Sequence, residues 1–177
     1  MSEEQPLPRE IRCVLVPAGN LRLLLPNATI AEIITYGTPE PVTDAPPWLL
    51  GRIAWRGWRV PLVSFGQLSD SAAGDDAAGV RVAVLKALGG HPRLPFVALL
   101  TQGLPRLTTL NAELIIPTHD GKPLPPGLCA QVLVRDDLAV IPDLEWLEAQ
   151  LLTLPDAAEP TKTLAAHDGH ERVGTGG

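Results

Sequence analysis

Residues 45–65 read APPWLLGRIAWRGWRVPLVSF, and this stretch decides how the chain is interpreted. It holds three of the four tryptophans together with the arginines Arg52, Arg56 and Arg59. Two apolar runs, 52–56 and 58–64, flank Gly57, a residue that adopts the positive φ of a tight turn at no steric cost. We therefore predict a β-hairpin whose Arg-Gly turn faces a partner. Because the hairpin contains no obvious catalytic group, it favours recognition over chemistry.

Composition limits the remaining choices. The 177 residues are 45% hydrophobic and carry a net charge of −6, so the chain can build a core and is poorly suited to phosphate backbones. Only 19% of residues are charged, which leaves apolar surface for contacts with other proteins. Nineteen prolines and sixteen glycines imply many turns and short elements, as in mainly β proteins.

The sequence offers no site for a metal or a cofactor. The four histidines do not form a ligand set, and Cys13 and Cys129 lack a CxxC spacing, so we expect two buried thiols in a reducing compartment. No Gly-rich phosphate loop or nucleophile elbow is present, and we predict no catalytic residue and no enzyme activity. The polar, acidic first residues do not resemble a signal peptide and no run is long enough to span a membrane, so we expect a cytoplasmic protein without membrane insertion.

Short apolar and β-branched runs predict strands in addition to the hairpin, at 11–17, 21–25, 81–88, 94–101, 107–110, 114–116, 130–135 and 138–141. Asn27 predicts a helix cap, and Ile30, Ile33 and Ile34 have helical spacing, so we favour a helix over 27–36, with a strand as the alternative. The proline-rich segment 37–47 is expected to be extended, with a single turn over 48–51. Pro61 suggests an edge strand.

The end of the chain predicts a helix followed by a tail. Asp143 can cap a helix that runs to about Leu152, with leucines at helical spacing along one side. From Pro155 the sequence has almost no large apolar residue, and we expect residues 155–177 to be disordered. The acidic segment 69–79 is expected to be a mobile loop and residues 1–9 a flexible N-terminus, which leaves residues 10–154 for one ordinary domain or two small, fused ones.

Three blocks resemble the CheW-like family of bacterial chemosensory adaptors. The hairpin region matches in order: a proline-rich approach (46–50), Gly51-Arg52-Ile53, Ala54-Trp55-Arg56-Gly57, and the strand 60–65. Upstream, 30–33 (IAEI) matches a Val-x-Glu-(Ile/Val) segment. Near the end, 138–143 (LAVIPD) before a leucine helix matches the closing strand, aspartate and helix. The resemblance covers roughly residues 10 to 154.

This resemblance implies a mainly β fold of two intertwined five-stranded SH3-like barrels, with short helices and a C-terminal helix. It implies a non-enzymatic adaptor that couples the cytoplasmic tip of a chemoreceptor to the regulatory domain of a CheA-type histidine kinase. The partner-binding residues that it implies are Glu32, Ile33, Trp55, Arg56, Gly57 and Trp58. Four positions depart from the family pattern, which indicates a divergent accessory member such as one of a type IV pilus chemosensory system: Arg52, Ala54, Trp55 and Ser64.

Each of these residues also has a plainer interpretation. Arg56 and Glu32 can form an ion pair that only orders the hairpin, and Trp55 and Trp58 can be core residues rather than interface anchors. Trp48, which follows two prolines, is expected in the core. The alternative function is a small barrel that binds nucleic acid, because the hairpin mixes cations with stacking surfaces; the acidic balance of the chain opposes it.

Overall fold

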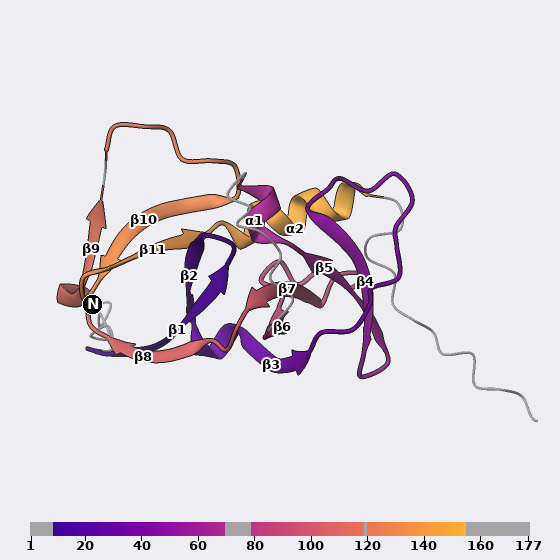
Figure 1. The fold of residues 1–177 in the computed structure, drawn as a ribbon, viewed down its shortest axis with the longest axis horizontal. Coiled ribbons are helices and arrows are strands. Elements are labelled where there is room, and N and C mark those ends of the chain that lie inside the picture. The colour runs from indigo at the N-terminus through magenta and orange to yellow at the C-terminus, as the bar shows by residue number, and fades with distance from the viewer. Residues whose placement is uncertain (1–8, 70–78, 119, 155–177) are drawn as a thin grey trace, which may run out of the picture.

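The computed structural model describes residues 9–69, 79–118 and 120–154, whose strands form two sheets (Figure 1). The six-stranded sheet has the order β8-β1-β2-β11-β10-β9 and is built from β1 (Ile11–Ala18), β2 (Leu21–Pro26), β8 (Arg106–Leu110), β9 (Ile115–Thr118), β10 (Leu128–Val134) and β11 (Asp137–Pro142). The five-stranded sheet has the order β3-β6-β7-β5-β4 and is built from β3 (Ile30–Thr35), β4 (Leu49–Trp55), β5 (Trp58–Val63), β6 (Val80–Lys86) and β7 (Phe96–Gln102).

The two sheets exchange segments, because the N-terminal hairpin belongs to the sheet made by the end of the chain. β1 pairs antiparallel with β8, and β2 pairs parallel with β11. This confirms the expected mainly β, two-part intertwined architecture. One sheet has six strands rather than five, because β1, β2 and four later strands join it.

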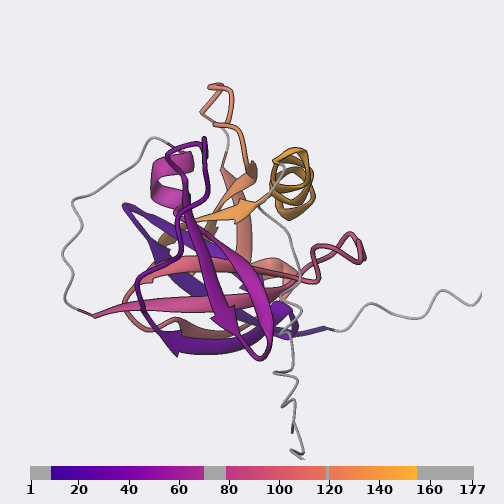
Figure 2. The same ribbon diagram turned by 90° about the vertical axis from the view of Figure 1, so that its right-hand side faces the viewer.

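The hydrophobic residues gather in three clusters among the described residues. One cluster lies within each sheet, and the largest takes side chains from both sheets and from α2 (Leu144–Thr153). Figures 1 and 2 show α1 (Phe65–Leu68) and α2 at one side of the molecule, where the two sheets meet. Burial of this shared cluster joins the two sheets into one folding unit.

The C-terminal helix forms as predicted. The side chain of Asp143 accepts a hydrogen bond from the backbone N–H of Trp146 (2.9 Å), and Leu144, Leu147 and Leu151 are buried. The carboxylate of Glu148, itself only 6% exposed, accepts bonds from two consecutive backbone N–H groups, those of residues 88 and 89 (2.6 and 2.7 Å). The helix is therefore fastened to the β6–β7 loop as well as to the core.

The predicted helix over 27–36 is wrong. Only Asn27–Thr29 forms a short 3-10 helix, η1, and β3 follows it directly. The pairing of β3 with β6 shifts register between Ile30 and Glu32, which is the geometry of a β-bulge. The bulge puts Ile30 and Ile33 against the largest cluster and Ile34 against the cluster of the five-stranded sheet. The spacing that suggested a helix therefore results from an extra residue in a strand.

Smaller differences concern the hairpin region. β4 starts at Leu49, so the expected turn over 48–51 does not form there. The segment before it, expected to be extended, is interrupted by a turn at Thr43 and Asp44, where Asp44 has a φ of 56°. β5 lies between β4 and β7 rather than at an edge; its pairing with β7 covers Leu62 and Val63, immediately after Pro61. Trp48 is half-buried against the largest cluster, as expected. The expectations for 1–8, 70–78 and 155–177 lie outside the described residues.

Candidate functional site

The β4–β5 hairpin ends in a two-residue turn. Arg56 and Gly57 have φ values of 45° and 79°, and Trp55 and Trp58 form the cross-strand pair that closes the turn. Positive φ at both central positions matches the twist of a hairpin, a turn type in which asparagine, aspartate and glycine are preferred. Arginine at the first position is strained relative to those residues. The turn nevertheless holds the Arg56 side chain out from the sheet with 69% of its surface exposed.

Glu32 completes this end of the sheet. The β-bulge before it puts Glu32 opposite Val84, on the side of β3 that faces the hairpin. Its Oε2 accepts a hydrogen bond from the indole Nε1–H of Trp55 (2.8 Å) and lies 3.1 Å from Nη2 of Arg56. One carboxylate oxygen therefore holds an aromatic residue and an arginine that come from an element 23 residues away.

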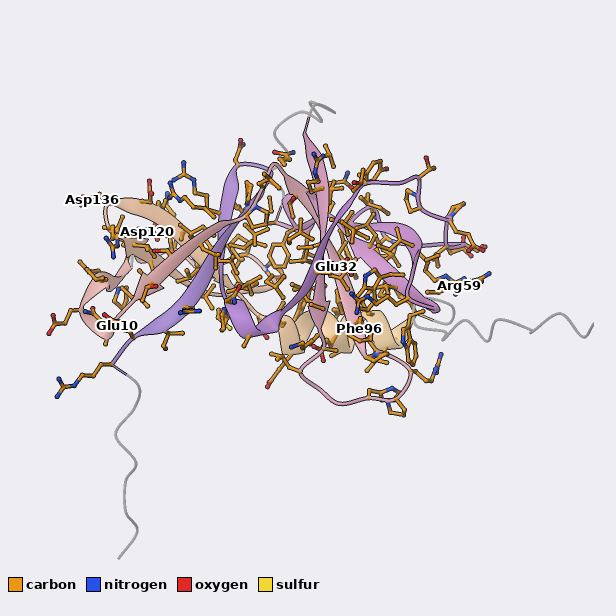
Figure 3. The ribbon with its side chains drawn as sticks, turned by 90° about the horizontal axis from the view of Figure 1, so that it is seen from below. Glu10, Glu32, Arg59, Phe96, Asp120 and Asp136 are labelled. Carbon is orange, nitrogen blue, oxygen red and sulfur yellow. The ribbon has the colours of Figure 1, made fainter. Side chains whose placement is uncertain are left out.

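Aromatic packing fixes the other side of the cluster. Phe96, at the start of β7, makes edge contacts with both Trp55 and Trp58, at centroid distances of 4.8 and 6.1 Å. The Arg56 guanidinium carbon lies 5.1 Å from the centroid of the Trp55 ring. Figure 3 places Glu32 and Phe96 on the side of the molecule that carries the hairpin, with Arg59 farther out. We call Glu32, Trp55, Arg56, Gly57, Trp58 and Phe96 the hairpin cluster.

Five of the six residues expected to bind a partner lie in this cluster. Ile33 does not, because the alternation along β3 turns it toward the largest hydrophobic cluster. Phe96 was not singled out in the sequence, where it is one apolar residue of a strand with no local mark. Trp55 is 9% exposed and Trp58 is half-buried, so both tryptophans pack within the fold and only part of each ring is accessible to solvent.

The six-stranded sheet has an arginine–carboxylate cluster of its own. Asp137 accepts hydrogen bonds from Arg22 Nη1 (2.7 Å) and Arg106 Nη2 (2.9 Å), and these two bonds hold the pKa of its carboxyl below the ordinary value. We call these three residues the strand cluster. Asp137 is the first residue of β11, and the turn residues before it are Arg135 and Asp136, both with positive φ.

The described residues contain neither a metal-ligand group nor an activated thiol. Within 9–69, 79–118 and 120–154, no three His, Cys, Asp or Glu residues are grouped to hold a metal. Both cysteines are free; Cys13 is buried, but Cys129 is exposed, contrary to expectation. Burial raises the pKa of both thiols, and nearby acidic residues add to the rise at Cys129, so neither is an activated thiolate. No helix in this part of the chain is long and apolar enough to cross a membrane.

The fold and this surface define a class: a mainly β recognition domain of two joined sheets that carries a charged and aromatic hairpin. Residues 12–150 match the family model described as the CheW-like domain, so the chain belongs to the CheW-like family. Members of this family are non-enzymatic scaffold and adaptor domains of chemotaxis signal transduction.

A solved structure agrees with this assignment. The chain is similar to the scaffolding protein TtCheW from Thermoanaerobacter tengcongensis, with a TM-score of 0.64 and 14% sequence identity, over 81% of this chain and 90% of that one. At this identity the likeness shows the fold. A search of curated proteins finds no match.

Proposed function

We propose that this chain is a cytoplasmic adaptor that couples the cytoplasmic tip of a chemoreceptor to the regulatory domain of a CheA-type histidine kinase. The observation that carries the proposal is the family match over 12–150. The adaptor domain that we propose runs from about residue 10 to 154. We infer that the chain works without cofactor or metal, by holding two protein surfaces in a fixed relation.

We assign the receptor surface to five of the expected residues, Glu32, Trp55, Arg56, Gly57 and Trp58, because Ile33 packs against the largest hydrophobic cluster instead. Support comes from the geometry of Arg56, whose guanidinium is exposed but held on one side by Glu32 and on the other by Trp55. A charged group that is already oriented loses little conformational entropy on binding. Tryptophan and arginine are also the residues most enriched at the energetic centres of interfaces.

We assign the kinase surface to the outer face of the six-stranded sheet. Leu133 is the register partner of both Ile116 and Leu138, so these three side chains form a row across β9, β10 and β11. Ile116 and Leu138 are 56% and 52% exposed. An apolar row on the outside of a sheet suits a partner domain that buries it. The two surfaces lie on different sheets, so both partners can bind together, and many weak contacts in an array add up by multivalency.

The test is affinity capture from lysate of the source bacterium with three folded proteins: the wild type, Arg56→Asp and Leu138→Glu. The wild type is expected to recover a chemoreceptor and a CheA-type kinase, identified by mass spectrometry. Arg56→Asp should lose the receptor and Leu138→Glu the kinase. Recovery of neither partner by the wild type would overturn the adaptor function, whereas unchanged recovery by a variant would overturn the assignment of that surface.

We propose further that the receptor system is an accessory one, such as a type IV pilus chemosensory system. The departures from the family pattern at Arg52, Ala54, Trp55 and Ser64 support this proposal. The identity of the recovered receptor decides it: a receptor encoded with pilus genes supports it, and a flagellar chemotaxis receptor contradicts it.

A further inference from the structure

A cavity of about 300 Å³ lies between β3, the connecting segment after it, and β4. β3 and β4 are the two outer strands of the five-stranded sheet, and the connector crosses over β4 at Gly51 and Arg52. The cavity is separate from the hairpin cluster, none of whose residues line it. Its lining residues are Ile34, Thr35, Gly37, Thr38, Glu40, Arg52, Ile53 and Ala54.

Arg52 is held firmly in the wall of this cavity. Its backbone N–H donates to the carbonyl of Glu40 and its carbonyl accepts from the N–H of Glu40, both at 2.8 Å. The neighbouring Gly51 has a φ of 139°, and a Cβ there would collide with the Glu40 backbone, so the two segments are in close contact. The position of the Arg52 side chain is therefore set by the fold.

The guanidinium of Arg52 has unused donors. Its Nε and Nη1 are buried, and neither has a hydrogen-bond partner in the protein. Arginine cannot lose its proton at any ordinary pH, so burial of these two atoms without partners leaves two N–H groups of a charged side chain unsatisfied. Donors of this kind are normally satisfied by protein, water or a ligand.

The local charge balance shows that this cation is in excess. The hairpin carries three arginines, of which Arg56 pairs with Glu32 and Arg59 lies 3.6 Å from a carboxylate oxygen of Glu40. Both nearby carboxylates are therefore engaged by other arginines. Arg52 is the remaining positive charge.

We propose that this cavity is an oxyanion-binding site in which Arg52 supplies the charge. Thr35 and Thr38, which carry hydroxyl groups able to donate to an anion, also line the cavity, and both residues are exposed, which gives a small anion a way in. The apolar walls contributed by Ile34, Ile53 and Ala54 strengthen the attraction by lowering the local dielectric. The Glu40 carboxylate at the lining is paired with Arg59, and an apolar molecule would leave the Arg52 donors unsatisfied. The ligand chemistry is therefore a carboxylate or an inorganic oxyanion.

The test is an NMR titration of the Arg52 side-chain Nε–H resonance with acetate and, separately, with inorganic phosphate at constant ionic strength. We expect a saturable shift for at least one anion, and an upward shift of the unfolding temperature in that anion relative to chloride. Acetate binding more tightly identifies a carboxylate, such as a partner's acidic side chain, as the natural ligand; phosphate binding more tightly identifies a free inorganic anion.

Two variants make the result specific. Arg52→Met should abolish the anion-dependent rise in unfolding temperature, and Arg52→Lys should weaken it several-fold because ammonium lacks the planar fork. Arg12→Met is the matched control: Arg12 lines a cavity of similar volume, about 320 Å³, together with Thr108 and Thr109, but its side chain is exposed. It should behave as the wild type does.

A wild type in which neither anion gives a saturable shift would overturn the site and indicate that water satisfies Arg52. An equal response in Arg52→Met and the wild type would also overturn it. Neither result bears on the adaptor function, because the titration uses no partner protein.

Discussion

The molecule has two arginine–carboxylate clusters, one on each sheet, and they are built differently. In the hairpin cluster one carboxylate, Glu32, receives an indole N–H and one arginine, and that arginine occupies a strained turn position over an aromatic ring. In the strand cluster one carboxylate, Asp137, receives two arginines that extend from regular strands.

The difference concerns what each arginine does for the fold. Arg22 and Arg106 connect three strands through Asp137 and need no unusual backbone geometry, as expected of surface pairs that order neighbouring strands. Arg56 holds a positive φ where asparagine or glycine would be easier, and its guanidinium stays mostly exposed. Local strain combined with exposure is the pattern of a functional group, and this is the basis for placing the receptor surface at the hairpin.

The largest expected effect separates the two clusters directly. Arg56→Asp should weaken binding of a purified receptor-tip fragment about 100-fold, the scale of an interfacial hot spot. The matched variant Arg106→Asp makes the same charge change in the strand cluster and should change that affinity less than about twofold. Isothermal titration calorimetry gives both values. Equal losses in the two variants would show that net charge, and not the hairpin, controls binding.

The next effect concerns the aromatic support of the hairpin. Phe96→Ala removes the ring that contacts both Trp55 and Trp58. The variant should lower the free energy of unfolding by about 2 kcal/mol, because Phe96 is half-buried and its neighbours can fill only part of the space that the ring leaves. Urea denaturation followed by tryptophan fluorescence measures this loss. A loss below about 0.5 kcal/mol would show that the tryptophans are held by the sheet without Phe96.

A smaller effect isolates the hydrogen bond from the indole. Trp55→Phe keeps a ring against Phe96 but removes the Nε1–H donor to Glu32, and should cost about 1 kcal/mol. Because Glu32 then keeps only Arg56, the double variant Trp55→Phe, Arg56→Asn should be less stable than the sum of the single changes predicts. Strict additivity in this cycle would contradict the shared role of Glu32.

The smallest effect is the dependence on pH in the strand cluster. The pKa of Asp137 is lowered in the folded state, so its carboxylate stabilises the fold above the unfolded-state pKa, and this contribution is lost as pH falls through the folded-state pKa. Asp137→Asn should therefore be slightly less stable than the wild type at neutral pH, and the difference should vanish in strong acid. A difference that persists unchanged in acid would mean that Asp137 acts through packing and not through charge.

Much of the hairpin could be predicted from sequence, because its information is local. Gly57 between two apolar runs indicates a turn, and the tryptophans on either side become its closing pair. The resemblance to known adaptors predicted that Glu32 lies close to Arg56, and in the structure Glu32 contacts both Trp55 and Arg56. Ile33, predicted beside it, was lost from the site because a strand turns alternate residues to opposite sides.

Other features could not be predicted because they depend on contacts between distant segments. The bulge in β3 gives its isoleucines the spacing of a helix, and only the pairing of β3 with β6 distinguishes a bulged strand from a helix. Phe96 and the strand cluster join residues from strands far apart in the chain, without any local motif. The pairing of the first hairpin with the last strands likewise follows from sheet topology, which residue patterns do not encode.

We infer that the Arg56 guanidinium serves a partner at the expense of the turn. Arg56→Asn tests it most directly, because asparagine adopts the same backbone geometry more easily and has no charge. We expect Arg56→Asn to unfold with a free energy equal to that of the wild type or up to about 1 kcal/mol higher, yet to bind the receptor-tip fragment at least tenfold more weakly. Unchanged affinity, or a loss of stability by more than about 1 kcal/mol, would contradict it and make Arg56 a residue of the fold.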